Sequence, residues 1–324
     1  MSDPLRRRLR RSPTWLALQE ARREGLRAAL TRRRRQRPIL RTPPLRTSAA
    51  GPVEVRVLTW RRDWINAIWA LKSFYHFARV DWPLHIHDGG LTPPQARALR
   101  RHFPDATLVD AAIADRRVEP ILAARGLDRT LAYRRKNPSM RKLVDFHLLS
   151  TADRVLSIDS DIVFFRRPDL LVGRGLDMPV NLYNRDCDYW YSLPLEQIAS
   201  AFGLHPPPYI NSGLALVRRE TMDLSAVDGW LAHPSLAEDP WVAEQTLHAL
   251  LGAVHGVELL PAEYKVDTKP GLDASTVCKH YPGFFRSGLY TEGMARLAAA
   301  GFLGMLRDAA RHPGDIGIAS TESL

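Results

Sequence analysis

The fold is decided by the stretch Arg154-Val-Leu-Ser-Ile-Asp159-Ser-Asp161-Ile-Val-Phe-Phe165, which holds two carboxylates inside an otherwise apolar run. A short apolar run with several β-branched residues predicts a strand buried on both faces of an α/β sheet. Residues two apart on a strand share a face, so Asp159 and Asp161 can approach one divalent cation at its carboxyl end. Open α/β sheets place their ligands at that edge. The alternative interpretation is an acidic turn that interrupts a strand.

The composition indicates one large domain, because the chain has 324 residues of which 45% are hydrophobic. No stretch approaches the ~18 to 20 uninterrupted apolar residues of a spanning helix, and the N-terminus lacks the apolar core of a secretory signal. The two cysteines, Cys187 and Cys278, form neither a disulfide framework nor a zinc-ligand spacing. These features predict a cytoplasmic protein in a reducing compartment.

Positive charge is concentrated at the N-terminus. Residues 1–50 hold fifteen arginines and three acidic residues, a net charge of +12, which leaves −1 of the total of +11 for the rest. We therefore expect an Arg-rich extension over residues 1–50, disordered or helical in part, a folded domain over 51–312 and a flexible tail over 313–324. The extension has three interpretations: a solvated segment, a peripheral contact with an anionic membrane on the cytoplasmic face, or, least favoured, a nucleic-acid contact.

Strands and helices alternate from Val53 onward. Strands are predicted over residues 53–59, 84–87 and 106–109 and in the segment that leads to Asp159, and helices over 64–78, 93–103 and 139–150. This β–α–β order predicts a single α/β domain with a mainly parallel sheet flanked by helices.

The segment Val155-Leu-Ser-Ile-Asp-Ser-Asp161 resembles the Asp-x-Asp region of GT-A glycosyltransferases, especially glycosyltransferase family 8. Three downstream segments match in that family's order. They are Tyr209-Ile-Asn-Ser-Gly213, similar to its Asn-x-Gly strand; Trp241-Val-Ala-Glu244-Gln245, similar to its acidic-Gln helix start; and Cys278-Lys-His280-Tyr-Pro-Gly283-Phe-Phe-Arg286, similar to its His-x-x-Gly-x-x-Lys element. The resemblance covers residues 53–290, and Arg286 stands where the family usually has lysine.

The resemblance implies a Rossmann-like GT-A fold and a metal-dependent glycosyltransferase. Such an enzyme moves a hexose from a nucleotide-diphosphosugar, here expected to be a UDP-sugar, to an unidentified glycan, lipid or protein acceptor with retention of configuration. It implies a divalent cation bound by Asp159, Asp161 and His280, and oxygen ligands with one imidazole suit Mn²⁺ or Mg²⁺ better than Zn²⁺. The alternative for His280 is a structural histidine whose hydrogen bonds are satisfied within the protein.

Further residues are expected to contact the donor. The donor phosphates are expected to contact Lys142, Gly283 and Arg286, with Lys279 nearby. The base is expected to contact Thr59, Trp60 and Asp88, and the sugar Asn211, Gly213, Glu244 and Gln245. Ser160, between the two aspartates, is expected to contact the donor in general. Plainer explanations exist for three of them: a solvated helix face for Lys142, turn chemistry for Asp88 and a helix first turn for Glu244. The acidic and aromatic residues 186–191 can shape an acceptor cleft.

Two other functions are compatible with parts of the sequence. The first is a non-catalytic sugar-nucleotide-binding or scaffold protein that has the same fold without turnover. The second is a haloacid-dehalogenase-type phosphatase, which also begins with Asp-x-Asp after an apolar strand. That class needs a downstream Gly-Asp followed closely by another acid, and the pair Gly314-Asp315 is followed by apolar residues instead.

Overall fold

The computed structural model describes residues 25–311 apart from Asp239 and Thr268. The first half of the expected N-terminal extension and the tail expected over 313–324 therefore lie outside the described residues. None of the described helices combines the length and apolar character needed to cross a membrane.

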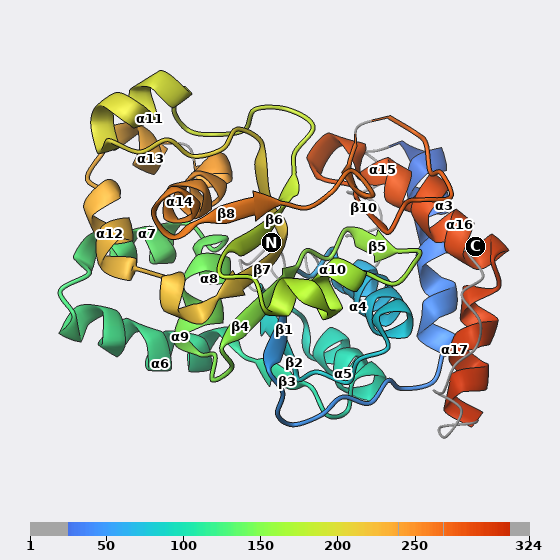
Figure 1. Ribbon diagram of the computed structural model, residues 1–324. Helices are drawn as coiled ribbons and strands as arrows, with labels where there is room; N and C mark the ends of the chain where they lie inside the picture. Colours follow the sequence, from blue (N-terminus) through green and yellow to red (C-terminus); the bar gives the residue numbers. More distant parts are fainter. Residues whose placement is uncertain (1–24, 239, 268, 312–324) are drawn as a thin grey trace, which may run out of the picture.

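A seven-stranded sheet forms the centre of the molecule, in the order β3-β2-β1-β4-β7-β6-β8 (Figure 1). Its strands are β1 Val53–Thr59, β2 Leu84–Asp88, β3 Thr107–Val109, β4 Arg154–Ile158, β6 Asn181–Arg185, β7 Ile210–Arg218 and β8 Val257–Leu259. Neighbouring strands are parallel except where β7 pairs with β4 and with β6. The α/β class and the mainly parallel sheet expected from the sequence are confirmed.

Helices cover both faces of this sheet. The described helices, of which some pack on other helices at the side of the molecule, are α3 Leu26–Gln36, α4 Trp64–Ala78, α5 Pro93–His102, α6 Ala111–Ala124, α7 Asp128–Lys136, α8 Met140–Leu143, α9 Asp145–Leu148, α10 Asp169–Val172, α11 Leu195–Phe202, α12 Leu224–Trp230, α13 Pro234–Glu238, α14 Pro240–His255, α15 Arg286–Gly288, α16 Met294–Ala299 and α17 Phe302–Arg311. The helix expected over 139–150 is thus divided into α8 and α9, which meet at Val144.

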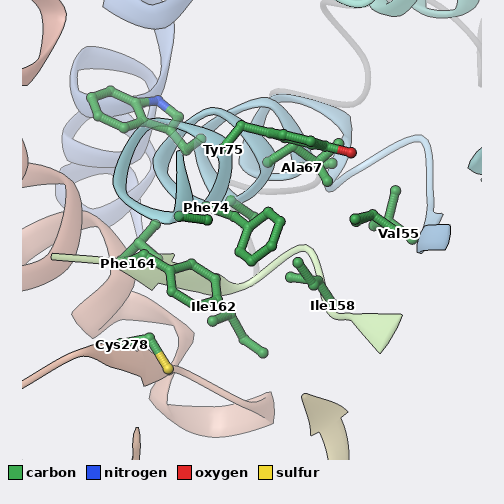
Figure 2. Packing of buried hydrophobic residues seen from close by; sticks show 14 of the residues in the cluster. Val55, Ala67, Phe74, Tyr75, Ile158, Ile162, Phe164 and Cys278 are labelled. Carbon is green, nitrogen blue, oxygen red and sulfur yellow. The ribbon is translucent and has the colours of Figure 1, made fainter. Parts of the chain in front are cut away.

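Side chains of β7 alternate between the two faces, as the period of a strand requires. Leu214 and Leu216 join the core under α4, whereas Ala215 and Val217 join the core on the opposite face. Figure 2 shows the first of these cores, in which α4 contributes Phe74 and Ala67 against residues of β1, β4 and β5. The sheet is therefore packed on both faces.

The segment from Arg154 to Phe165 forms two strands and not one. β4 ends at Ile158, and β5, over Ile162–Phe164, belongs to a second sheet in the order β5-β10-β9. β9 spans Tyr264–Val266 and β10 spans Cys278–His280. Between β4 and β5 the chain turns, with the Ile162 N–H donating to the Asp159 carbonyl. The prediction of one strand through Phe165 was wrong at this turn, and the two carboxylates stand on it.

The described part of the N-terminal segment packs on the domain. Ile39 is fully buried, Gln36 Nε2 donates to Asn66 Oδ1 at 2.6 Å, and Trp69 Nε1 donates to the Gln36 carbonyl at 3.0 Å. Because these contacts reach into α4, residues 25–50 are continuous with the core that begins at Val53. The part of the expected Arg-rich extension that the structure describes contains the helix α3, and the contacts of Gln36 attach this part to the domain.

Candidate functional site

Asp159, Asp161 and His280 come together at the carboxyl edge of the sheet. His280 Nε2 lies 3.2 Å from Asp161 Oδ1 and 4.0 Å from Asp159 Oδ2. One ligand atom from each of the three residues lies within 4.8 Å of the others. The sheet explains this meeting, because β10 pairs antiparallel with β5 and sets His280 opposite Ile162, the residue after Asp161. The sequence correctly predicted this three-residue cluster.

The orientation of the His280 ring is fixed by Asn211. Asn211 Nδ2 donates to Asp186 Oδ2 at 2.7 Å, and its Oδ1 accepts from the Gly213 N–H at 3.0 Å, so the oxygen of the amide faces His280. His280 Nδ1 lies 3.0 Å from that oxygen and must carry the hydrogen, since the oxygen can only accept. The unprotonated nitrogen of a neutral His280 is therefore Nε2, which faces the two carboxylates.

This donor set fits a divalent cation. A neutral Nε2 beside two carboxylates brings together three lone-pair donors, and a divalent cation can bind all three at once, while Lys142 and Arg286 donate to the carboxylates from the sides. Burial alone would lower the pKa of His280, but the Asp161 carboxylate outweighs burial and raises it. A metal-ligating histidine commonly donates its other N–H to a carbonyl or carboxylate, as His280 does here.

Gly213 makes room for the imidazole. A Cβ atom added to Gly213 would lie 2.8 Å from His280 Nδ1 and 2.9 Å from Asn211 Oδ1, too close for any side chain. The Gly213 carbonyl accepts from the Asp159 N–H at 2.7 Å, so the same residue also holds the acidic turn. The group that approaches Gly213 in the structure is His280, whereas the approach of a donor sugar expected from the sequence stays a prediction.

Lys142 lies inside the site and not on a solvated helix face. Its Nζ is 3.1 Å from Asp159 Oδ1 and 3.7 Å from Glu244 Oε2, and its side chain is 10% exposed. Burial by itself would lower the pKa of Lys142, but the Asp159 and Glu244 carboxylates raise it above its ordinary value. Lys142 therefore carries a fixed positive charge next to the acidic turn. Ser160 is buried within that turn.

Glu244 and Gln245 face the site from α14. Ser212 Oγ donates to Glu244 Oε2 at 2.9 Å, and the Ser212 N–H donates to Gln245 Oε1 at 3.3 Å. His248 Nε2 lies 3.1 Å from the other oxygen of Glu244. Since α14 begins at Pro240, Glu244 is beyond the first turn, and the helix-start explanation does not apply. Ser212 was missed in the sequence, although its position between Asn211 and Gly213 was a usable signal.

Arg286 neutralises the opposite side of the acidic turn. Its guanidinium donates to Asp161 Oδ2 at 2.7 Å and to both oxygens of Asp63 at 3.1 and 3.2 Å. The Asp161 carboxylate raises the pKa of Arg286. Asp63, just before α4, had no signal in the sequence because no motif surrounds it. Gly283 has φ +50°, a left-handed conformation that favours glycine.

The residues expected near the base share the carboxyl edge of the sheet. Thr59 ends β1 and is paired in register with Asp88, which ends β2. The Asp88 carboxylate accepts from the N–H groups of Gly90 and Leu91, both at 2.6 Å, so turn chemistry already occupies one of its oxygens. Thr59 Oγ1 is buried without a hydrogen-bond partner among the described residues. Trp60 is half-buried beside them.

Lys279 points away from the site. Its Nζ lies 2.9 Å from Glu292 and donates to the Lys269 carbonyl at 2.7 Å. Side chains alternate along β10, so Lys279 and His280 face opposite sides of that strand. The expectation that Lys279 flanks a phosphate does not fit this geometry.

At the level of sequence, no protein-family model and no curated protein matches the chain. Among solved structures, mouse xyloside xylosyltransferase 1 is similar over 66% of this chain and 87% of its own, with 17% identity and a TM-score of 0.44. The galactosyltransferase LgtC, solved with donor and acceptor sugar analogues, is similar over 76% and 95%, with 13% identity and a TM-score of 0.46. Core-mannan synthase A from Aspergillus fumigatus, in an Mn/GDP form, is similar over 68% and 75%, with 10% identity and a TM-score of 0.43. At these identities the similarity concerns the fold alone.

Proposed function

We propose that the protein is a metal-dependent glycosyltransferase that moves a hexose from a nucleotide-diphosphosugar, a UDP-sugar in the first place, to a hydroxyl acceptor. The observation that carries this proposal is the Asp159, Asp161 and His280 cluster at the carboxyl edge of the sheet. Such edges are where open α/β sheets bind nucleotides. When Mn²⁺ or Mg²⁺ is bound by these three residues, it supplies electrostatic stabilisation for a diphosphate leaving group.

The side chains around the cluster supply the remaining requirements. Lys142 and Arg286 place positive charge on either side of the acidic turn, where a diphosphate needs it. Asn211 keeps His280 in one tautomer, and Asp186 keeps the Asn211 amide in one orientation. Preorganised groups of this kind require no rearrangement as charge develops in the transition state.

Retention of the anomeric configuration is part of the proposal. Glu244, the carboxylate nearest to Ser212, is engaged by Lys142, Ser212 and His248, which makes it a poor nucleophile. Gln245 is neutral and too weak a base for that role. In the reaction that we propose, the bond between the anomeric carbon and the phosphate oxygen breaks, the acceptor oxygen bonds on the same face, and its proton passes to the departing phosphate.

Calorimetry with Mn²⁺ and a series of UDP- and GDP-hexoses tests the binding step. We expect donor binding to require the metal and to weaken at least tenfold in Asp161→Asn, with Asp308→Asn, an exposed residue of α17, unchanged. Hydrolysis or transfer of the bound sugar, assayed with Mn²⁺ and then with EDTA, tests turnover, and NMR of the first product anomer tests retention. Tight binding without turnover would favour the scaffold alternative, and binding unaffected by EDTA would contradict the metal site.

A further inference from the structure

Helix α3 presents an amphipathic, basic surface on the outside of the domain. Ala29, Arg32 and Gln36 are buried, and their spacing of three and four residues defines the face that packs on the protein. Leu26, Leu30, Arg33 and Arg37, the residue that follows α3, form the stripe i, i+4, i+7 and i+11 on a flank of the helix beside the buried face, and Arg27 and Arg34 continue it toward the opposite face; all six are exposed. Leu26 is 66% exposed and Leu30 56%. We call these six residues the α3 surface.

The charge of the α3 surface is not neutralised by the domain. Residues 25–50 contain no acidic residue, and the four arginines of the surface make no ion pair with any described residue. Arg46, farther along, is paired with Asp105 at 2.8 Å. A helix that exposes two leucines among arginines that pair with none of the described residues is complementary to a partner that is both anionic and apolar.

We propose that the α3 surface docks the protein on an anionic lipid bilayer. Arginines attract the negative headgroups, while exposed leucines on the same face can enter the boundary between headgroups and acyl chains. A nucleic acid would satisfy the arginines but would offer no apolar layer for Leu26 and Leu30. The leucines therefore favour the bilayer, and a nucleic acid becomes an outcome of the test.

Helix α3 is attached to the domain by hydrogen bonds, so a membrane bound to α3 would also be connected to the domain. Gln36 bonds to Asn66 and Trp69 of α4, and Asn66 Nδ2 donates to Tyr290 Oη at 3.3 Å. The residue before α4, Asp63, binds Arg286 of the candidate site. In Figure 1, α3 (blue) lies between α4 and α16, and it is in contact with both. Docking through α3 would thus hold the sheet edge at a fixed orientation to the bilayer. The proposal is independent of the proposed chemistry.

Co-sedimentation of the full chain with vesicles tests this proposal. Vesicles of neutral phosphatidylcholine are compared with vesicles that also contain phosphatidylglycerol, whose anionic headgroups give the surface a negative potential. We expect binding to the anionic vesicles alone. Arg33→Gln/Arg34→Gln should weaken it about 30-fold, since each arginine near the surface contributes roughly fivefold. Leu26→Gln/Leu30→Gln should weaken it at least about tenfold, since apolar burial is lost.

The matched control is Arg97→Gln/Arg100→Gln on α5, which removes the same charge from two exposed arginines of another helix. We expect it to bind as the unchanged chain does. Equal binding to neutral vesicles, or equal losses in the α3 and α5 variants, would overturn the proposal. The proposal would also be overturned if Leu26→Gln/Leu30→Gln bound the anionic vesicles as well as the unchanged chain and a short DNA duplex displaced the vesicles. That result would favour a nucleic acid as the partner. All substituted side chains are exposed, so an unchanged thermal unfolding temperature is expected throughout.

Discussion

Arg286 donates a hydrogen bond to the Asp161 carboxylate at 2.7 Å, across 125 residues of chain. Burial would raise the pKa of Asp161, but Arg286 and His280 lower it, so this carboxylate remains ionised in the folded protein. The same guanidinium also binds Asp63. Arg286 therefore joins the acidic turn to the start of α4, a task that needs two donor nitrogens in one plane.

Replacement of Arg286 by glutamine should lower the free energy of unfolding by about 1–3 kcal/mol, because it leaves two largely buried carboxylates without their cation. Arg286→Lys should recover only part of the loss, since an ammonium cannot bridge both partners as a guanidinium does. Urea unfolding measures both. Asp63→Asn combined with Arg286→Gln should cost less than the sum of the single changes, and strictly additive losses would contradict a direct pair.

Gly213→Ala should displace the imidazole of His280, although none of the three expected metal ligands is substituted. The added methyl group would press on His280 and on Asn211 Oδ1. We expect Mn²⁺ affinity, measured by electron paramagnetic resonance, to fall about 10- to 100-fold, as it does when the groups that orient a ligand are disturbed. Gly229→Ala on α12, where a Cβ meets nothing within 4 Å, is the matched control. Equal affinity in the two variants would argue against His280 as a ligand.

The sequence predicted the parts of the site that are local in character. Asp159 and Asp161 interrupt an apolar run, and the Asn-Ser-Gly and Lys-His-Tyr-Pro-Gly segments have unusual residues for strands. Polar groups within buried strands are costly unless they find partners, so such interruptions carry information. Periodicity likewise gave the strands β1 and β2 and the helix α4 within a residue of their bounds.

What the sequence could not give are partners that meet only through the fold. Asp63 reaches Arg286 because α4 packs beside β5 and the segment after β10. No motif near residue 63 predicts this ion pair. Composition left three interpretations of residues 1–50 open, and it carries no information on the contacts of single side chains within that segment. Ile39 lies in the fully buried core, and one buried side chain there outweighs the average polarity of its neighbours.

The burial of Ile39 allows a direct test of whether residues 25–50 contribute to the stability of the domain. Ile39→Ala should destabilise the protein by about 2–4 kcal/mol, the usual cost of a cavity at a fully buried isoleucine. Leu40→Ala, at a half-buried neighbour, should cost distinctly less. If residues 25–50 were a separate extension, neither change would move the thermal unfolding transition. A chain that starts at Gly51 should unfold at a lower temperature than the full chain, since it exposes Trp69 and the partners of Gln36.

Lys72 provides the clearest pH dependence of stability. It lies on α4 with 1% of its surface exposed, and its Nζ donates to Thr42 Oγ1 at 2.8 Å and to the Pro43 carbonyl. Burial lowers the pKa of Lys72 from its ordinary 10.5 to about 7. Nearby His102 has its pKa lowered by burial to about 4 and therefore stays neutral above pH 6.

Stability should consequently rise as the pH is raised from 7 toward 10. In that range the unfolded chain keeps the proton on Lys72 while the folded chain has released it, so the unfolded state binds more protons and is disfavoured as protons become scarce. The free energy of unfolding is expected to rise by about 1–2 kcal/mol between pH 7.0 and 8.5. Each pH unit over which the unfolded chain holds one proton more than the folded chain contributes ~1.4 kcal/mol. Urea unfolding of the unchanged chain and of Lys72→Met at the two pH values isolates this residue, because other groups titrate equally in both. We expect the difference between the two proteins to change by that amount, with the lysine form gaining as the pH rises; parallel pH profiles would show that Lys72 keeps its proton in the folded state.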